Sequence, residues 1–392
     1  MPFRSWLSSL SKISDRRSTR RRHRRSGSHP TPQRELGRQS TESLEQRCLL
    51  TTIDLATLTA AQGTTIFGAD AGDQSGISVS SAGDVNGDGF DDLLIGAFFA
   101  DASGNGKYNA GESYVIFGGD SLPTTIDLAN LGADGITIFG ADAFDYSGIS
   151  VSGAGDVNGD GFDDLLIGAN AADASGNGKS SAGDSYVIFG GDSLPTTIDL
   201  ANLGADGITI FGADAFDYSG RSVSSAGDVN GDGFDDLLIG ANRAAASGNG
   251  KYNAGDSYVI FGGASLPTTI DLANLGTAGI TIFGADESDF SGHSVSSAGD
   301  VNGDGFDDLL IGAHFADASG NGKSSAGDSY VVFGGDSLPA TIDLANLGTA
   351  GITIFGADTG DNSGFSVSSA GDVNGDGFDD LLIGRASCRE RV

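Results

Sequence analysis

The stretch DVNGDGFDD first occurs at residues 84–92, and four further copies follow at an unvarying period of 72 residues. The later copies start at Asp156, Asp228, Asp300 and Asp372. A fixed period of this kind indicates a repeat architecture, in which one structural unit recurs along the chain. The spacing of oxygen-bearing side chains within the stretch is also that of a calcium loop. The sequence therefore predicts a series of similar units, each with its own metal-binding loop.

One full unit alternates short apolar segments with loops rich in Gly, Asn and Asp. Residues 76–83 (GISVSSAG) alternate in polarity, whereas residues 92–97 (DLLIGA) form a continuous apolar run. Residues 113–119 (SYVIFGG) and 136–139 (ITIF) supply two more segments, which gives four strands per unit. Four strands per repeat are typical of a propeller blade. We therefore expect an all-β fold, a β-propeller over residues 49–384, with solenoid stacking as the competing geometry.

The repeat region begins and ends inside a unit. Residues 51–70 match only the second half of later units, which suits ring closure if this strand completes the final blade. At the other end the last copy continues as IGRASCRERV, whereas every other copy continues as IGA. One reading frame of a common sequencing adapter encodes that string, so we expect residues 385–392 to be a contig-end artefact. On this interpretation the propeller is truncated at its C-terminus.

Charge divides the chain into two parts. Residues 1–48 carry 12 Lys and Arg against 4 acidic residues, whereas residues 49–384 carry 6 against 48. The repeat region therefore has a net charge near −42, the wrong sign for contact with phosphate, which argues against nucleic acid as a partner. Bound cations would relieve the mutual repulsion of so many carboxylates.

The head of the chain, residues 1–48, is rich in Arg, Ser and Pro and is predicted to be disordered. Residues 44–50 (LEQRCLL) resemble the LEPR-XLL segment near the N-terminus of large exported bacterial proteins, with Gln46 in place of its Pro. A solvated basic tail or a mis-assigned start codon are the alternatives. No apolar run approaches the length of a transmembrane segment. Cys48 and Cys388 lie outside the repeats, so no disulfide framework is expected.

Side-chain oxygens stand at positions 1, 3, 5 and 9 of the repeated stretch, and Phe at position 7 offers its backbone carbonyl. Ca²⁺ prefers about six to eight oxygens from a loop that curls round it, and Gly at position 6 permits the sharp turn. Val85 and Phe90 can point inward and anchor the loop on the core. We predict one Ca²⁺ site in each copy, formed by Asp84, Asn86, Asp88, Phe90 and Asp92; Asp156, Asn158, Asp160, Phe162 and Asp164; Asp228, Asn230, Asp232, Phe234 and Asp236; Asp300, Asn302, Asp304, Phe306 and Asp308; and Asp372, Asn374, Asp376, Phe378 and Asp380.

Other interpretations of this loop fit less well. An EF-hand needs an acid at position 12, which is Ile95 here, and a dockerin needs a helix where DLLIGA stands. Mg²⁺ is less suited, because a flexible cage made only of protein oxygens favours the larger ion. The plain alternative is an Asx-rich turn that holds no metal, and five copies with all four oxygen positions intact argue against it.

Residues 67–97 (FGADAGDQSGISVSSAGDVNGDGFDDLLIGA) resemble the FG-GAP repeat of integrin α-subunit propellers and of many bacterial surface proteins. Phe67-Gly68, Gly83-Asp84 and Gly96-Ala97 fall at the landmarks of that repeat. The Pro of its third landmark is replaced in successive units by Phe98, Asn170, Asn242 and His314. The resemblance covers residues 51–384. It implies a β-propeller, one Ca²⁺ in the loop between strands 1 and 2, and an extracellular binding role, and it leaves the ligand open.

A second acidic loop joins strands 2 and 3. Asp101, Ser103 and Asn105 again stand at positions 1, 3 and 5, with Gly at position 6 and Glu112 at position 12. Two other units repeat the outer pair of acids, and Ala245 replaces the first acid in the third unit. The loop is either a second metal site or a plain polar hairpin. The repeated pairs are Asp173 with Asp184 and Asp317 with Asp328.

Differences between the units cluster after strand 2 and around the start of strand 1, the two places opposite the calcium loop. Variation confined to one face of a repeat protein often marks a binding surface, although neutral drift of exposed loops has the same effect. Aromatic and Arg side chains there suit contacts with protein or sugar. The variable positions are Phe98-Phe99, Asn170-Ala171, Asn242-Arg243 and His314-Phe315 after strand 2, with Gln74, Tyr146, Tyr218, Phe290 and Asn362, and Ile77, Ile149, Arg221, His293 and Phe365, at strand 1.

No set of catalytic residues can be assembled from the repeats. His293 and His314 are single substitutions in otherwise similar loops, and uniform units offer no unique asymmetric site. The sequence therefore predicts an exported, Ca²⁺-binding, extracellular β-propeller, with no enzymatic activity, that binds a protein partner in adhesion at the cell surface. The alternatives are a lectin-like propeller that binds a glycan, and an accessory module of a truncated extracellular enzyme.

Overall fold

The structure, a computed structural model, describes Leu55 and residues 63–101, 106–173, 178–245, 250–317 and 322–385. The chain divides into two units, Met1–Thr52 and Ile53–Val392, and the described residues lie in the second unit. The basic head, the LEPR-XLL-like segment and the tail from residue 386 lie outside the described residues. None of the helices in the described ranges has the length and apolar character that a membrane crossing requires.

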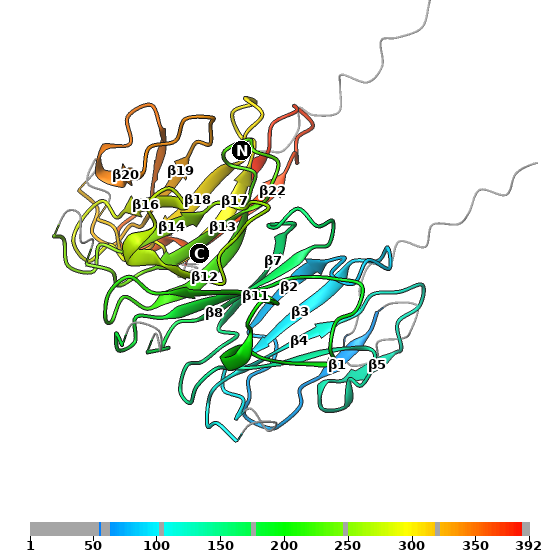
Figure 1. The fold of residues 1–392 in the computed structure, drawn as a ribbon. Helices are drawn as coiled ribbons and strands as arrows, with labels where there is room; N and C mark the ends of the chain where they lie inside the picture. The colour runs from blue at the N-terminus through cyan, green and yellow to red at the C-terminus, as the bar shows by residue number, and fades with distance from the viewer. Residues whose placement is uncertain are drawn as a thin grey trace, which may run out of the picture. The chain divides into compact units, whose positions relative to one another are not determined.

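Each 72-residue period forms an antiparallel sheet of four strands that pair in chain order (Figure 1). The first sheet contains β2 (Ser78–Gly83), β3 (Asp92–Ala97), β4 (Glu112–Ile116) and β6 (Gly135–Phe139). The predicted all-β propeller of four-stranded blades is therefore confirmed. The later blades are β7 (Ser150–Gly155), β8 (Asp164–Ala169), β9 (Asp184–Ile188) and β11 (Gly207–Phe211); β12 (Ser219–Gly227), β13 (Asp236–Ala241), β14 (Asp256–Ile260) and β16 (Gly279–Phe283); β17 (Ser294–Gly299), β18 (Asp308–Ala313), β19 (Asp328–Val332) and β21 (Gly351–Phe355); and the partial pair β22 (Ser363–Gly371) and β23 (Asp380–Arg385).

The link between strands 3 and 4 has structure that the sequence did not reveal. In each link, three residues form a short strand and the next three form a 3₁₀ turn, as in β10 (Thr197–Asp199) and η3 (Leu200–Asn202). β10 pairs in parallel with β6 of the preceding blade, so a segment of one unit extends the sheet of its neighbour. The equivalent pairs are β1 (Thr65–Phe67) with β5 (Thr125–Asp127), β15 (Thr269–Asp271) with β11, and β20 (Thr341–Asp343) with β16.

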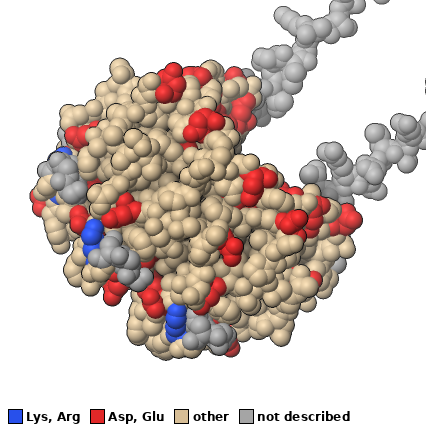
Figure 2. All heavy atoms as spheres, viewed as in Figure 1, with Lys and Arg blue, Asp and Glu red and all other residues tan. Residues whose placement is uncertain are grey.

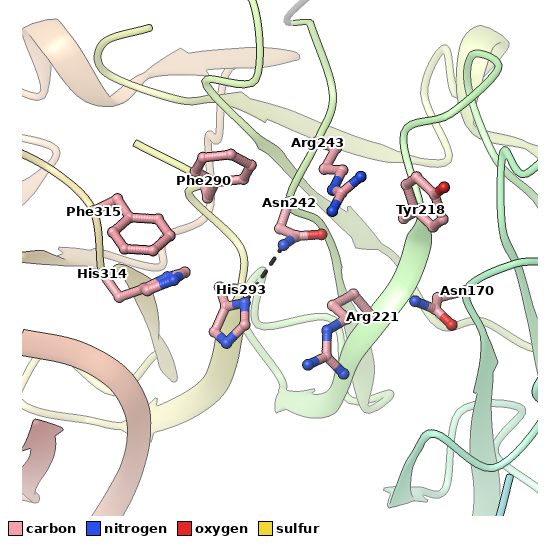
Figure 3. Close-up of a pocket in the computed structure, with 9 residues that line it drawn as sticks. All are labelled: Asn170, Tyr218, Arg221, Asn242, Arg243, Phe290, His293, His314 and Phe315. Atoms are coloured by element: carbon pink, nitrogen blue, oxygen red, sulfur yellow. Dashed lines mark hydrogen bonds between the residues drawn. The ribbon is translucent and has the colours of Figure 1, made fainter. Parts of the chain in front are cut away.

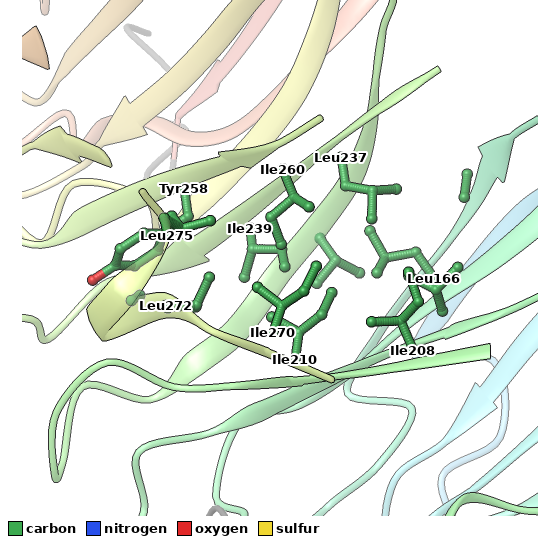
Figure 4. Close-up of a cluster of buried hydrophobic side chains, with 14 of the residues drawn as sticks. Leu166, Ile208, Ile210, Leu237, Ile239, Tyr258, Ile260, Ile270, Leu272 and Leu275 are labelled. Carbon is green, nitrogen blue, oxygen red and sulfur yellow. The ribbon is translucent and has the colours of Figure 1, made fainter. Parts of the chain in front are cut away.

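The hydrophobic core lies between neighbouring sheets. In one cluster, Leu166 of β8 and Ile208 of β11 pack with Ile239 of β13 and Ile260 of β14 (Figure 4). Equivalent residues are exposed where no neighbouring sheet covers them. Val79 is 64% exposed and Val151 only 5%, and Leu382 is 64% exposed whereas its equivalents in complete blades are fully buried. The series of described sheets is therefore open at both ends and forms a partial propeller.

The strand that begins each sheet lies against its counterpart in the next sheet. The Ser78 hydroxyl accepts a hydrogen bond of 2.9 Å from the Val151 N–H, and the same bond recurs between later blades. Strand 2 also approaches the next blade closely. A methyl group at Gly168 of β8 would lie 2.1 Å from the Gly220 carbonyl oxygen. Contact between blades thus depends on small side chains at fixed places in each unit.

This close approach predicts that Gly168→Ala destabilises the protein, because the backbone of the neighbouring blade must move. Overpacking of this kind costs about 1–3 kcal/mol in the free energy of unfolding. Gly384→Ala at the equivalent position is the matched control, because the nearest atom among the described residues would lie 3.3 Å from the new methyl group. Urea denaturation of both variants tests the prediction, and equal losses of stability would contradict it.

Candidate metal-binding loops and ligand pocket

The DVNGDGFDD stretch folds into a tight loop between strands 1 and 2, held by its own side chains. In the second copy Asp156 Oδ1 accepts N–H groups from Gly159 at 2.7 Å and Asp160 at 3.1 Å, and Oδ2 accepts from Gly161 at 2.9 Å. Asn158 Oδ1 accepts the Asp160 N–H at 2.8 Å. Closely similar bonds recur in the other four copies. The loop is therefore curled round the side chains at positions 1, 3 and 5, which accept its backbone N–H groups.

The acid at position 9 begins strand 2 and is buried in each complete blade. Asp164 accepts the Val157 N–H at 3.0 Å with Oδ2 and the Gly190 N–H at 2.9 Å with Oδ1. Burial, with a smaller contribution from the carboxylates of Asp160 and Asp156, raises the pKa of Asp164 to about 7, although the two backbone hydrogen bonds act to lower it. Three carboxylates therefore repel one another in a loop whose sequence offers no Lys or Arg.

The donors in this loop are carboxylate, amide and carbonyl oxygens, the set that Ca²⁺ prefers. Among the described residues, no three Asp, Glu, His or Cys side chains are arranged as a ready metal cage, since the carboxylates face backbone N–H groups. A carboxylate has about four acceptor sites, so those bonds leave capacity for a cation. The donor set fits Ca²⁺, and the five ligand sets stay a prediction.

The two apolar residues of the loop differ in their surroundings. Val85 is buried in the core as expected. Phe90 is 39% exposed and Phe378 45%, so the expectation that this Phe anchors on the core is wrong. The ring of Phe162 instead lies over Gly87 of the preceding loop, where a methyl group would meet it at 2.5 Å. Phe at position 7 therefore packs between loops.

The sequence analysis also gave no role to Asp at position 8, which is present in every copy. Asp163 Oδ2 accepts the Asp84 N–H of the preceding loop at 2.8 Å. Gly83 makes room for this bond, because a methyl group there would lie 2.2 Å from that oxygen. The bond recurs three times along the chain, so each loop is fastened to the next. The other pairs are Asp235 with Asp156, Asp307 with Asp228 and Asp379 with Asp300.

Removal of this carboxylate should weaken contact between blades. We expect Asp163→Ala to lower the free energy of unfolding by about 1 kcal/mol, because the partly buried Asp84 N–H loses its acceptor. Asp91→Ala removes the same charge at the same position of the first copy, which no other copy precedes in this chain. Chemical denaturation should show a smaller effect for Asp91→Ala, and the reverse order would refute the role given to position 8.

The second acidic loop contributes to a cavity of about 170 Å³. Asp173 and Asp184, the predicted pair, line it together with Asp142 and Asp145 from the link before strand 1. Asp184 is 2% exposed, and its Oδ1 has no hydrogen-bond partner in the described part of the chain. The sequence analysis missed Asp142 and Asp145, although FGADxxD occurs in every unit. Of the other predicted ligands, Asp101 and Glu112 are described and Ser103 and Asn105 lie outside the described residues.

This acidic cavity gives the metal-free protein a definite pH dependence. Burial raises the pKa of Asp145 and Asp184 from 3.8 to about 7. The folded state therefore keeps protons that the unfolded chain has released between about pH 4 and pH 7, and this stabilisation is lost as the pH rises through 7. With a chelator present, the melting temperature should fall by several degrees from pH 5 to pH 8. A melting temperature that rises with pH would contradict this account.

Nine of the variable residues opposite the calcium loops line one pocket of about 370 Å³ (Figure 3). The register of β12 and β13 places Ser219 opposite Ala241 and Gly227 opposite Asp236, so the variable positions and the calcium loop lie at opposite ends of the hairpin. The pocket is lined by residues of three successive blades, Asn170, Tyr218, Arg221, Asn242, Arg243, Phe290, His293, His314 and Phe315.

Contacts within the pocket hold its side chains in place. The Arg243 guanidinium lies 4.9 Å from the centre of the Tyr218 ring, a cation–π distance. Asn242 Nδ2 lies 3.4 Å from His293 Nδ1, and the His293 ring centre is 4.1 Å from that of His314. The repeats alone indicated the face but could not show that these side chains meet.

Fold and loops together define a β-propeller built from integrin-type repeats. The FG-GAP repeat family matches residues 75–116, 147–188, 219–260, 291–332 and 363–386. The chain is 29% identical over 228 residues to integrin alpha-5 of Xenopus laevis, which is 56% of this chain and 19% of that protein. It is 30% identical over 250 residues to integrin alpha pat-2 of Caenorhabditis elegans, 62% of this chain and 18% of that protein. The repeat region is therefore an FG-GAP, integrin α-like β-propeller.

A third relative has a different name. The phosphatidylinositol-glycan-specific phospholipase D of Dictyostelium discoideum is 29% identical over 194 residues, 48% of this chain and 20% of that protein. The chain thus spans about a fifth of the length of the relatives it matches. The similarity is shared by proteins named as integrins and as an enzyme, so it identifies the propeller and leaves the activity of the whole protein open.

Proposed function

We propose that this protein is an extracellular, Ca²⁺-binding propeller that mediates adhesion by binding a protein partner at the cell surface. The observation that carries the binding role is the convergence of the variable residues on one pocket. Similarity to integrin α subunits supports a ligand-binding propeller. Because no catalytic set is present among the described pocket residues, we propose a non-enzymatic role, with the phospholipase relative sharing the propeller.

In this proposal, bound calcium would stabilise the folded propeller. Each DVNGDGFDD loop places the carboxylates of positions 1, 5 and 9 near one another, and a cation would offset their repulsion. The ligands would be the oxygens of Asp84, Asn86, Asp88, Phe90 and Asp92 and their equivalents. Since each loop is bonded to the next through position 8, a cation in one loop would also stiffen its neighbour.

Calorimetric titration of the full chain with Ca²⁺, with melting followed in parallel, tests this role. We expect about one ion per copy, with dissociation constants of about 10⁻⁴–10⁻³ M as in other extracellular modules, and a melting temperature that rises with Ca²⁺. Asp160→Ala should remove one ion from the stoichiometry. Asp120→Ala, which removes an exposed carboxylate outside the loops, should leave the stoichiometry unchanged. Identical melting with and without chelator would exclude a stabilising role for calcium.

A glycan is the second candidate for the partner, and the composition of the pocket favours it specifically. Tyr218, Phe290 and Phe315 offer ring faces, and Asn170 and Asn242 offer amide groups. Sugar-binding sites combine such apolar faces with a few convergent polar groups.

A further inference from the structure

The basic residues of the repeats fall into two groups with different surroundings. The four lysines stand at equivalent positions, and each donates to a backbone carbonyl of the following unit. All the arginines and histidines of residues 49–384 instead line the pocket: Arg221, Arg243, His293 and His314. The lysine pairs are Lys107 with Ala141, Lys179 with Ala213, Lys251 with Ala285 and Lys323 with Ala357.

The charge of the pocket comes from its arginines. Burial lowers the pKa of His293 to about 3 and that of His314 to about 4, so both imidazoles are neutral at pH 7. None of the lining residues is acidic, and within the described ranges neither Arg221 nor Arg243 takes part in an ion pair. A partly buried guanidinium without a counter-charge is costly, and a bound anion would remove that cost.

Aromatic and amide groups surround these arginines. The Phe290 and Phe315 ring centres are 5.6 Å apart, and the buried Nδ1 of His314 has no hydrogen-bond partner among the described residues. Tyr218 and Phe290 have φ values of 56° and 55°, a left-handed conformation that is unfavourable for a residue of this kind. The equivalent residue in the last copy is Asn362, for which this conformation is easier. Tyr146, outside the pocket, has the same conformation with φ of 56°, so the repeat itself sets this backbone and directs Tyr218 and Phe290 to the pocket.

We propose that this pocket binds a carboxylated sugar residue of the uronate class. The carboxylate pairs with the guanidinium groups of Arg221 and Arg243, which favour planar anions. The ring hydroxyls bond to the amides of Asn170 and Asn242 and to the imidazoles, and the apolar face of the sugar packs on Phe290 and Phe315. The volume of about 370 Å³ lies within the range of small-molecule sites. The inference rests on the proposed binding role of this face, takes the glycan rather than the protein as the partner, and names its chemical class.

Two other classes of anionic ligand fit the lining of the pocket less well than a uronate. An acidic peptide side chain would engage the arginines and leave the hydrogen-bonding groups around them without partners. A ligand with several phosphates would be repelled by the net charge near −42 of the repeats. Figure 2 shows carboxylates spread over the visible face, with basic side chains at only a few points. A ligand with one negative charge and several hydroxyls matches the lining best.

Ligand-observed NMR and calorimetry on the full chain with Ca²⁺ test the proposal, with glucuronate, glucose, N-acetylaspartate and inorganic phosphate as probes. We expect binding of glucuronate and a preference of about tenfold or more over each of the other three. Arg221→Gln should weaken glucuronate binding by about tenfold or more. Arg243→Gln, at an exposed position, should act in the same direction and keeps the test open if Arg221→Gln fails to fold. Lys179→Gln, which removes the same charge outside the pocket, should leave the affinity unchanged.

Each outcome decides the assignment. Equal binding of N-acetylaspartate or phosphate would overturn the sugar assignment, and so would an equal loss of affinity in Lys179→Gln. Absence of glucuronate binding in a chain that still takes up Ca²⁺ and melts at a higher temperature with it would refute the pocket assignment and leave the proposed calcium-stabilised propeller in place. Absence of both would remove the two proposals together.

Discussion

The hydrogen bond from the backbone of one loop to the carboxylate at position 8 of the next is the contact on which the arrangement of blades depends. It joins Asp84 to Asp163 and repeats along the chain. This bond requires Gly83 and the equivalent glycines, because a side chain there would occupy the space of the carboxylate. One nine-residue string therefore makes the turn within a blade and also the bond to its neighbour. Because each copy has both roles, its sequence and its spacing of 72 residues are the same in all five copies.

The same string creates the main electrostatic problem of the fold. Acids at position 9 are buried in the complete blades, and burial raises their pKa values to about 6 or 7. The acidic cavity beside the second loop adds further buried carboxylates. The repeats hold only four lysines. Three of them lie 3.5–3.8 Å from the exposed carboxylates of Asp142, Asp214 and Asp286, and the buried acids at position 9 have no such partner among the described residues. Protons or bound cations would offset the remaining repulsion, and near neutral pH a cation would be the more effective of the two.

Much of the fold could be predicted from the sequence. Alternating and apolar runs identified the four strands of each blade, since each run is bounded by turn residues. The parallel strand Thr197–Asp199 was missed. Three residues are too few to show the alternation of polar and apolar side chains that indicates a strand, and the pairing partner belongs to another unit. The Phe at position 7 was misplaced, because in the later copies its ring packs on a glycine of the preceding loop, as Phe162 does on Gly87. The position-8 Asp was visible as an unvarying residue, but only the structure shows its partner.

The ligand pocket could be predicted only in part from the sequence. Comparison of the units located the variable face. The start of strand 1 and the end of strand 2 lie at the same end of an antiparallel pair, so their variable residues share one face. The comparison could not show that Arg221, Arg243, His293 and His314 meet, because the spacing of blades decides that. Those four residues occupy positions where other units have aliphatic, amide or aromatic side chains. Three blades of nearly identical sequence thereby produce one asymmetric pocket.

The central claim is that each DVNGDGFDD loop holds a cation while it fastens one blade to the next. A crystal structure of the protein grown with Ca²⁺, with anomalous diffraction data, tests this most directly. We expect an anomalous peak inside each of the described loops, at about 2.3–2.6 Å from oxygens at positions 1, 3, 5, 7 and 9, with the position-8 carboxylate still bonded to the preceding loop. Loops without a peak, with every carboxylate bonded to backbone N–H groups alone, would contradict it.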